Sequence, residues 1–340
     1  MSLTVALDAR PLLDPGGEAF AYTLNLLHGL MYIDRGLRLH LFVDRQPEPA
    51  LLPIGDVAVT VLRAPAALWK TTQLGAAAKT VGADLLHVQG LLPVAPQLPV
   101  VTTLRHLQPQ WPATASGRCR RWAWQALLPR QLPRAAAVLV PWEAVRRQVC
   151  ERYGVRPARV TVTPYGAEPA FRPQCISVQS AVKEVLALPA RYVVGRGDGA
   201  RDVYDQARTA GLDAELVLFE GADTYRTLAG LEPPQYGAVL ASSLACILGG
   251  TGEAARLAML ESMAAGTPVV GTGDEVLAEI AGHAAVLGSP EAQAVALALW
   301  SPNGAERAAQ VQAGLERAKE FTWPAMAEKT LAAYQAALAV

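Results

Sequence analysis

The chain alternates short apolar runs with longer segments whose apolar residues recur at helical spacing. Residues 19–30 form one such segment, and another ends at Gly154, a residue type that commonly terminates helices. Because strands that alternate with helices form βαβ units, this pattern predicts a parallel sheet in the first half of the chain. Its predicted strands are Leu3–Leu7, Leu39–Val43, Val57–Leu62, Leu85–Val88, Val100–Leu104, Ala137–Val140 and Val160–Thr163.

The alternation restarts after a connector at residues 173–190, which contains a short predicted helix. A long alanine-rich helical stretch closes the chain. We therefore expect a second, smaller parallel sheet and two doubly wound halves in all. Ligands of such sheets bind beyond the carboxyl ends of the strands, in the loops that follow them. The predicted strands of this half are Tyr192–Gly195, Leu216–Phe219, Ala245–Leu248, Pro268–Gly271 and Ala284–Leu287.

Composition agrees with two α/β domains. The 340 residues suffice for two domains of roughly 150 residues each. Apolar residues make up 51% of the chain and charged residues 18%, as expected for sheets that are covered on both faces. Lysine and arginine total 30, as do aspartate and glutamate, so the formal net charge is zero and disfavours nucleic-acid binding.

The four cysteines lie far apart and lack the paired spacing of a disulfide framework or a zinc site. We therefore expect a cytoplasmic protein without a metal site. The chain starts without the features of a signal peptide, and no apolar run is long enough to span a membrane. One stretch leaves peripheral membrane contact open, although a solvated basic loop with packed tryptophans is the simpler interpretation. In this stretch Arg118, Arg120 and Arg121 interleave with Trp111, Trp122 and Trp124.

The segment from Ala245 to Thr272 has the strongest functional pattern. A strand is followed by the loop Gly249-Gly250-Thr251-Gly252, a helix from about Glu253, a stop at Gly266 and another strand. Free N–H groups at the start of a helix, reached through a glycine loop, let a phosphate approach the backbone closely. The pattern therefore predicts a diphosphate site at Gly250, Thr251 and Gly252.

Glu253 and Glu261 lie on the same predicted helix, separated by roughly 12 Å along the axis and about 80° around it. This separation is too large for one metal ion. The two carboxylates could instead contact opposite ends of a long ligand, for example a sugar and a ribose, because carboxylates accept hydroxyl hydrogen bonds strongly. From spacing alone, two surface glutamates are the simpler interpretation.

These segments resemble glycosyltransferase family 4, the group 1 retaining enzymes. Residues 253–270 are similar to the glutamate-x7-glutamate signature of the family. Residues 8–11, followed by Gly16-Gly17 and a helix, are similar to its opening strand and glycine loop. Other segments resemble, in the same order, the mid-domain strand, the domain-closing segment, the segment after the last strand and the terminal helix, at residues 84–87, 160–173, 279–282 and 317–334.

The resemblance implies an α/β protein of the GT-B type, in which two Rossmann-like domains place parallel sheets on either side of a cleft. It implies an acceptor-side domain at residues 1–172, a nucleotide-sugar-binding domain at 173–320, and a C-terminal helix at 321–340 that crosses back onto the first domain. The implied donor is a nucleotide diphosphate sugar, without a further cofactor. The implied acceptor is a glycan, a lipid-linked molecule or a small molecule.

Positions that match the family imply roles for individual residues. Glu261 would bind the ribose hydroxyls of the donor, and Glu253 would lie near the donor sugar. The backbone N–H of Leu257 would face the diphosphate, and Gly17 would approach it from the opposite side.

The family's arginine and lysine, which neutralise the leaving diphosphate, match Arg196 and Arg201. Arginine in place of lysine preserves the charge but changes its shape. Each of the two could alternatively be a surface arginine.

Several positions depart from the family pattern. Arg105 stands where the family has its active-site histidine, and His106 is one residue further along, where a strand would turn its side chain to the other face. Ala254 and Arg256 replace glycines after the first glutamate, and Trp142 replaces a serine. The region from residue 221 to 236 is also short and offers no clear apolar strand.

Two functional hypotheses therefore stand. One is an active retaining glycosyltransferase that needs no protein nucleophile and no metal. The other is a catalytically impaired GT-B protein that binds a sugar nucleotide or a glycan, or partners an active transferase. A dinucleotide-dependent oxidoreductase is disfavoured, because no strand precedes a complete G-x-G-x-x-G fingerprint with an acidic residue downstream.

Overall fold

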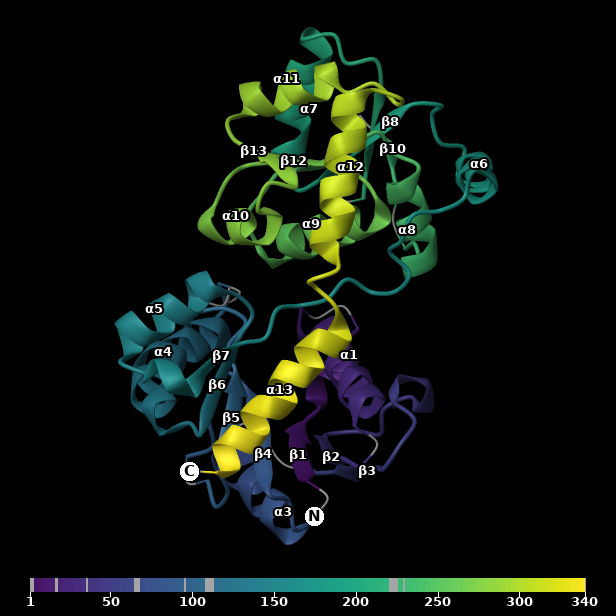
Figure 1. Cartoon of the computed structure of the whole chain (residues 1–340). Helices are drawn as coiled ribbons and strands as arrows, with labels where there is room; N and C mark the ends of the chain where they lie inside the picture. The colour runs from purple at the N-terminus through teal and green to yellow at the C-terminus, as the bar shows by residue number, and fades with distance from the viewer. Residues whose placement is uncertain are drawn as a thin grey trace. The chain divides into compact units, whose positions relative to one another are not determined.

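The computed structural model of the chain describes residues 3–15, 18–34, 36–63, 68–94, 96–107, 113–219, 226–228 and 230–339 (Figure 1). The chain forms two compact units. Unit 1 contains Met1–Tyr165 and Trp323–Val340, and unit 2 contains Gly166–Thr322. Residues 166–172, which the sequence resemblance assigned to the first domain, lie in unit 2, where Phe171 packs edge-on against Tyr236 with 5.3 Å between ring centroids.

Unit 1 is built on a parallel seven-stranded sheet in the order β3-β2-β1-β4-β5-β6-β7. The first strand lies inside the sheet, and the strand order reverses between β1 and β4. Apolar side chains fill these strands because helices cover both faces of a parallel sheet. The strands are β1 (Thr4–Asp8), β2 (Arg38–Val43), β3 (Val57–Val61), β4 (Leu85–Gln89), β5 (Val100–Thr103), β6 (Ala137–Val140) and β7 (Val160–Val162).

Helices connect these strands, and α5 ends as expected at Gly154, which has a positive φ of 64°. The last helix of the chain, drawn in yellow, lies beside α1 (Figure 1). This helix therefore belongs to unit 1. The helices of unit 1 are α1 (Glu18–Ile33), α3 (Leu74–Thr80), α4 (Ala115–Gln131), α5 (Glu143–Tyr153) and α13 (Trp323–Leu338), with short helical turns η1 (Arg10–Leu13), η2 (Pro49–Leu51), η3 (Trp69–Gln73), η4 (Leu132–Arg134) and η5 (Pro157–Arg159).

A buried hydrogen-bond chain ties α13 to the sheet. His87 on β4 contacts the Tyr334 hydroxyl through Nδ1 at 2.6 Å and the Thr103 hydroxyl through Nε2 at 2.8 Å. The hydroxyl of Tyr22 on α1 lies 2.8 Å from the same Thr103 oxygen. Burial lowers the pKa of His87 to about 3, although the charge of Asp8 acts in the opposite direction. His87 is therefore neutral in the folded protein.

Because His87 is neutral in the folded protein, we expect unit 1 to lose stability in acid. Its pKa is about 3 when folded but 6.5 in its unperturbed state, so the unfolded chain binds a proton first as the pH falls below 6.5. We expect a loss of about 2 kcal/mol between pH 7 and pH 5 from this group. Urea unfolding at several pH values measures this loss. A His87→Gln variant, although less stable at neutral pH, should show a weaker decline, and an unchanged decline would contradict the assignment.

Unit 2 has a parallel six-stranded sheet in the order β10-β9-β8-β11-β12-β13, again with a reversal, here between β8 and β11. Its strands are β8 (Tyr192–Arg196), β9 (Glu215–Leu218), β10 (Arg226–Thr227), β11 (Cys246–Leu248), β12 (Val269–Gly271) and β13 (Ala285–Leu287). Its helices are α6 (Ile176–Val185), α7 (Ala200–Thr209), α8 (Pro233–Ala241), α9 (Glu253–Ala265), α10 (Glu275–Ala281), α11 (Pro290–Leu299) and α12 (Ala305–Ala318).

The strands predicted from sequence are confirmed within one residue at each end, and two features differ. The basic segment with Trp122 and Trp124 is the helix α4 rather than a loop, and Trp122 is 71% exposed. The edge strand β10, which the sequence did not reveal, has two residues. Among the described helices, none combines the length and the hydrophobicity that a membrane span requires.

Candidate functional site

In unit 2 the strand reversal brings two glycine loops together at the carboxyl ends of β8 and β11. The Gly249 amide donates to the Arg196 carbonyl at 2.7 Å, and the Gly199 amide donates to the Gly249 carbonyl at 3.2 Å. A Cβ at Gly249 would lie 2.7 Å from both the Gly197 oxygen and the Gly199 nitrogen. Only glycine therefore fits at position 249, where it locks the two loops together rather than holding a ligand.

The next three residues of the loop form a backbone surface that is suited to an anion. Within the described chain, the amides of Gly250, Thr251 and Gly252 have no hydrogen-bond acceptor. A Cβ at Gly250 or Gly252 would meet no atom within 4 Å, so a ligand has room to approach. These amides lead into α9, whose N-cap residue provides no side-chain cap. Free amides and the positive end of the helix dipole favour a phosphate here.

Arg196, at the end of β8, is positioned by aromatic side chains. Its Nη1 donates to the Tyr236 hydroxyl at 3.0 Å. Its guanidinium carbon lies 5.3 Å from the centroid of the Tyr236 ring and 5.8 Å from that of Phe219. The two rings contact each other at 4.3 Å between centroids. This packing limits the rotamers of Arg196 and holds its charge beside the strand ends of the sheet.

Glu261, two turns along α9, joins the same cluster. Its carboxyl accepts a hydrogen bond from the Tyr236 hydroxyl. Burial raises the pKa of Glu261 to about 7; the charge of Glu168 also raises it, whereas Arg196 and the Tyr236 hydrogen bond lower it. Desolvation thus outweighs the favourable partners. A carboxyl with a pKa near neutrality in a partly open position is a mark of functional sites.

The other predicted donor-site residues of unit 2 lie on α9 and α7. Glu253 is the first residue of α9, and its Oε2 is shielded from solvent. Leu257 is half-buried one turn further along α9, and Arg201 is the second residue of α7. Arg256, where the family has a glycine, pairs at 3.7 Å with Asp274, the N-cap residue of α10. Its guanidinium is therefore engaged with α10.

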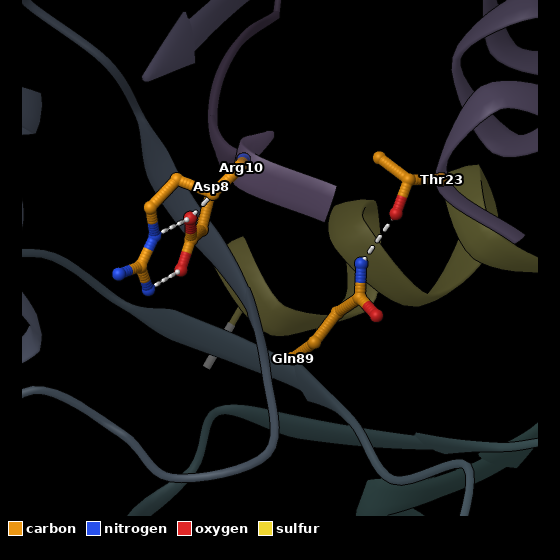
Figure 2. Close-up of polar contacts among 4 residues, drawn as sticks. All are labelled: Asp8, Arg10, Thr23 and Gln89. Atoms are coloured by element: carbon orange, nitrogen blue, oxygen red, sulfur yellow. Dashed lines mark hydrogen bonds and ion pairs between the residues drawn. The ribbon is translucent and has the colours of Figure 1, made fainter. Parts of the chain in front are cut away.

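Unit 1 places a polar cluster at the corresponding strand reversal, between β1 and β4 (Figure 2). The Asp8 carboxylate accepts from Arg10 Nε at 2.9 Å and from Arg10 Nη2 at 2.8 Å. The Arg10 guanidinium lies 4.3 Å from the centroid of the Trp69 ring. From β4, the Gln89 side-chain amide donates to the Thr23 hydroxyl at 2.6 Å. This edge of the sheet therefore holds both hydrogen-bond donors and hydrogen-bond acceptors in fixed positions.

Arg105 and His106 follow β5, the next strand of the same sheet, and both are half-buried. The charge of Arg105 acts on Tyr22, whose pKa burial raises to about 12. Both residues thus lie at the carboxyl edge of the unit 1 sheet, and their part in the reaction stays a prediction. Gly17 lies outside the described residues.

Sequence reasoning missed Tyr236, Phe219 and the polar cluster of unit 1. Tyr236 lies far from Arg196 and Glu261 in the chain, so no spacing indicates the contact. Gln89 directly follows a predicted strand and Arg10 lies a few residues after another, which is a signal that could have identified them. The loop Gly195-Arg196-Gly197-Asp198-Gly199 has the same glycine richness as residues 249–252 and could likewise have been recognised.

Comparison with known families confirms the resemblance to glycosyltransferase family 4 for the N-terminal part of the chain. Residues 19–171 match the family model described as Glycosyltransferase Family 4, and this range covers most of the N-terminal part of unit 1. None of the curated proteins is similar to the chain in sequence.

Solved structures share the fold over nearly the whole chain. A glycosyltransferase from Rickettsia africae ESF-5 superposes with a TM-score of 0.74 at 12% identity and covers 99% of both chains. Sucrose-phosphate synthase from Thermosynechococcus elongatus superposes with a TM-score of 0.70 at 17% identity, and 98% of both chains is covered. HepE from Anabaena, in complex with UDP and glucose, superposes with a TM-score of 0.67 at 14% identity. The match covers 98% of this chain and 100% of HepE. The fold is GT-B, as the sequence predicted.

Proposed function

We propose that this chain, which matches glycosyltransferase family 4 over residues 19–171 and has the GT-B fold, moves a sugar from a nucleotide diphosphate sugar to an acceptor hydroxyl with retention of configuration. The observation that carries the proposal is the row of open amides at Gly250, Thr251 and Gly252, which lies at the strand reversal next to the Arg196 strand end. The UDP complex of HepE supports a donor of this chemical class.

In the proposed reaction the bond between the sugar carbon and the diphosphate oxygen breaks, and the acceptor oxygen bonds to that carbon from the same face. The acceptor proton passes to the leaving diphosphate, so no protein nucleophile is required. The amides of residues 250–252 and the Arg196 guanidinium stabilise the charge that develops on the diphosphate. Arg201 adds a second positive charge at the start of α7. Because these groups supply the electrostatic stabilisation, we propose a metal-independent reaction.

The two glutamates of α9 hold the ends of the donor. Glu253 lies at the amino end of the helix and accepts hydrogen bonds from the sugar, and Glu261 lies two turns away and accepts from the ribose hydroxyls. Their separation along the helix suits a long ligand that contacts each carboxylate with a different end, while its diphosphate lies at the amides before Glu253. Tyr236 keeps Glu261 and Arg196 in place through its hydroxyl.

The proposal is tested by donor turnover. The purified chain is incubated with a panel of nucleotide diphosphate sugars, and release of the nucleoside diphosphate is followed with and without acceptor mixtures. We expect turnover of one donor, no change on addition of EDTA, and loss of turnover in Glu253→Ala. Glu184→Ala, which removes an exposed glutamate of α6, is the matched control. Turnover that survives in Glu253→Ala would contradict the assigned site.

Arg105, at the expected histidine position, favours the second candidate function, a binding subunit without activity. Calorimetric measurement of donor binding, together with the turnover assay, distinguishes the binding subunit from the enzyme. A donor that binds the wild-type chain and not Arg196→Ala, without any turnover, would support the binding subunit and overturn the enzyme.

We further propose that α4 brings the chain to anionic membranes that carry a lipid-linked acceptor. Four arginines of this helix, Arg118, Arg120, Arg121 and Arg130, are exposed, and its sequence contains no acidic residue. Trp122 exposes 71% of its surface, and such amphipathic rings favour the membrane interface.

Vesicle sedimentation measures this contact. We expect binding to vesicles that contain phosphatidylglycerol and little binding to pure phosphatidylcholine. Each arginine near an anionic surface contributes about 1 kcal/mol, so the triple variant Arg118→Gln, Arg120→Gln, Arg121→Gln should bind about 100-fold more weakly. Arg152→Gln on α5, also exposed, is the control and should bind like the wild type. Equal binding of the triple variant would contradict the proposal.

A further inference from the structure

Unit 2 contains a cavity of about 400 Å³, on the edge of its sheet where the strands begin. Arg191 and Tyr192 at the start of β8 line it, together with Leu244 before β11 and Gly266 after α9. Arg196 and the open amides lie at the opposite ends of the same strands. Since β8 has five residues, roughly 16 Å of strand separates the two edges. The cavity is thus distinct from the proposed donor site.

The lining of this cavity is cationic. Lys183, Arg191 and Arg307 contribute to it, and no aspartate or glutamate does. Arg191 forms an ion pair with Asp213 at 2.9 Å. Within the described part of the chain, neither Lys183 nor Arg307 has a carboxylate within 4.0 Å. Two positive charges therefore line one cavity without a negative counterpart.

Neutral carbonyl groups hold both cations in place. Arg307 Nε donates to the Leu244 carbonyl at 2.9 Å and its Nη2 to the Ser243 carbonyl at 3.0 Å. Lys183 Nζ donates to the Ala190 carbonyl at 3.0 Å. Burial lowers the pKa of Arg307, which means that desolvation of its charge is not offset by an anion of the protein.

A purely structural role for Arg307 explains only part of this arrangement. Capping the turn before β11 uses two of the five N–H donors of a guanidinium, and the two carbonyls supply no compensating charge. Lysine likewise has three donors, of which one is used. A half-buried cation that lacks a counter-ion is costly, unless an anionic ligand completes the site.

We propose that this cavity binds a small phosphorylated molecule, with Lys183 and Arg307 as the groups that recognise the phosphate. A phosphate ester carries up to two negative charges and several acceptor oxygens, which match two cations with unused donors. Ser242, Ser243 and Asn303 line the same cavity, and the exposed side chain of Asn303 offers a partner to a polar, sugar-sized remainder. The volume lies within the range of small-molecule sites.

Calorimetry with glucose 6-phosphate as the probe tests the proposal at constant ionic strength. We expect millimolar or tighter binding by the wild-type chain, and no binding of glucose itself. Lys183→Gln should raise the Kd at least tenfold, whereas Arg208→Gln, at an exposed position of α7, should leave it unchanged. Arg307→Gln is expected to raise the Kd more than Lys183→Gln does. If loss of the Arg307 contacts unfolds the chain, Lys183→Gln alone tests the proposal.

The donor loop could also hold a phosphate, so the two sites must be separated. Binding of glucose 6-phosphate at this cavity should persist in Arg196→Ala and in the presence of saturating UDP. Hydrogen exchange should slow near residues 243–244 and at the start of α12 when the probe is bound. Binding that UDP abolishes, binding that Lys183→Gln leaves unchanged, or the absence of binding would overturn the proposal. None of these results depends on whether the chain is a transferase.

Discussion

Arg196→Ala is expected to lower the rate constant for donor cleavage by about 10²–10³, the range found when one preorganised electrostatic group is removed from a transition state. The guanidinium is held by the Tyr236 hydroxyl and two aromatic rings, so it needs little reorganisation as charge develops on the diphosphate. Because this charge is greatest in the transition state, kcat should fall more than the affinity for the donor.

Single-turnover measurements with saturating donor isolate the chemical step for this comparison. Arg208→Ala removes an exposed arginine from the far end of α7 and is the matched control, which should retain the wild-type rate. Arg196→Lys keeps the charge but loses the planar fork, so we expect an intermediate rate. If Arg196→Ala raised only the KM, the residue would bind the donor without stabilising the leaving group.

The fold was predictable because periodicity encodes it locally. Runs such as Leu85–Val88 and Ala137–Val140 are too short and too apolar for surface helices, and the segments between them have helical spacing. The helix α9 was predictable at both ends, since Gly252 precedes it and Gly266 ends it with a φ of 77°. The basic helix α4 was not, because its arginines and tryptophans follow no amphipathic pattern.

The site was predictable only where one segment contains it. Residues 249–253 lie in a single loop and helix start, so their chemistry can be inferred from neighbours in the chain. The structure nevertheless divides that loop, since Gly249 is enclosed by the second glycine loop while Gly250 and Gly252 are open. The contact of Tyr236 with Arg196 joins residues 40 positions apart, and no local pattern predicts a contact of that kind.

Donor affinity is expected to fall about tenfold for each pH unit below 7. Glu261 must be a carboxylate to accept the ribose hydroxyls, and its pKa in the unliganded protein is about 7. The group is therefore ionised above that value and protonated below it, so the Kd at pH 5 should be about 100-fold higher than at pH 8. Calorimetric titration of the nucleoside diphosphate between pH 5 and pH 8.5 measures this dependence, and Glu261→Gln should bind weakly at every pH.

The same group should also make the folded chain less stable at high pH. The folded pKa of Glu261 lies above its unperturbed value of 4.5. The buried charge therefore lowers the free energy of unfolding by its full amount above pH 7 and has no effect below pH 4.5. Glu261→Gln should therefore stabilise the chain at pH 8 by about 2 kcal/mol, after allowance for solvent around its half-buried side chain, and should have little effect at pH 4.5.

Two neighbouring substitutions distinguish this titration from any other group in the site. Tyr236→Phe keeps the ring but removes the hydrogen bond that lowers the pKa of Glu261, so the midpoint of the affinity profile should move to higher pH. Glu168→Gln removes a negative charge that raises the pKa, and the midpoint should move to lower pH. Two shifts of opposite sign from residues of different elements follow only if both act on one carboxyl, whereas parallel or absent shifts would assign the pH dependence to another group.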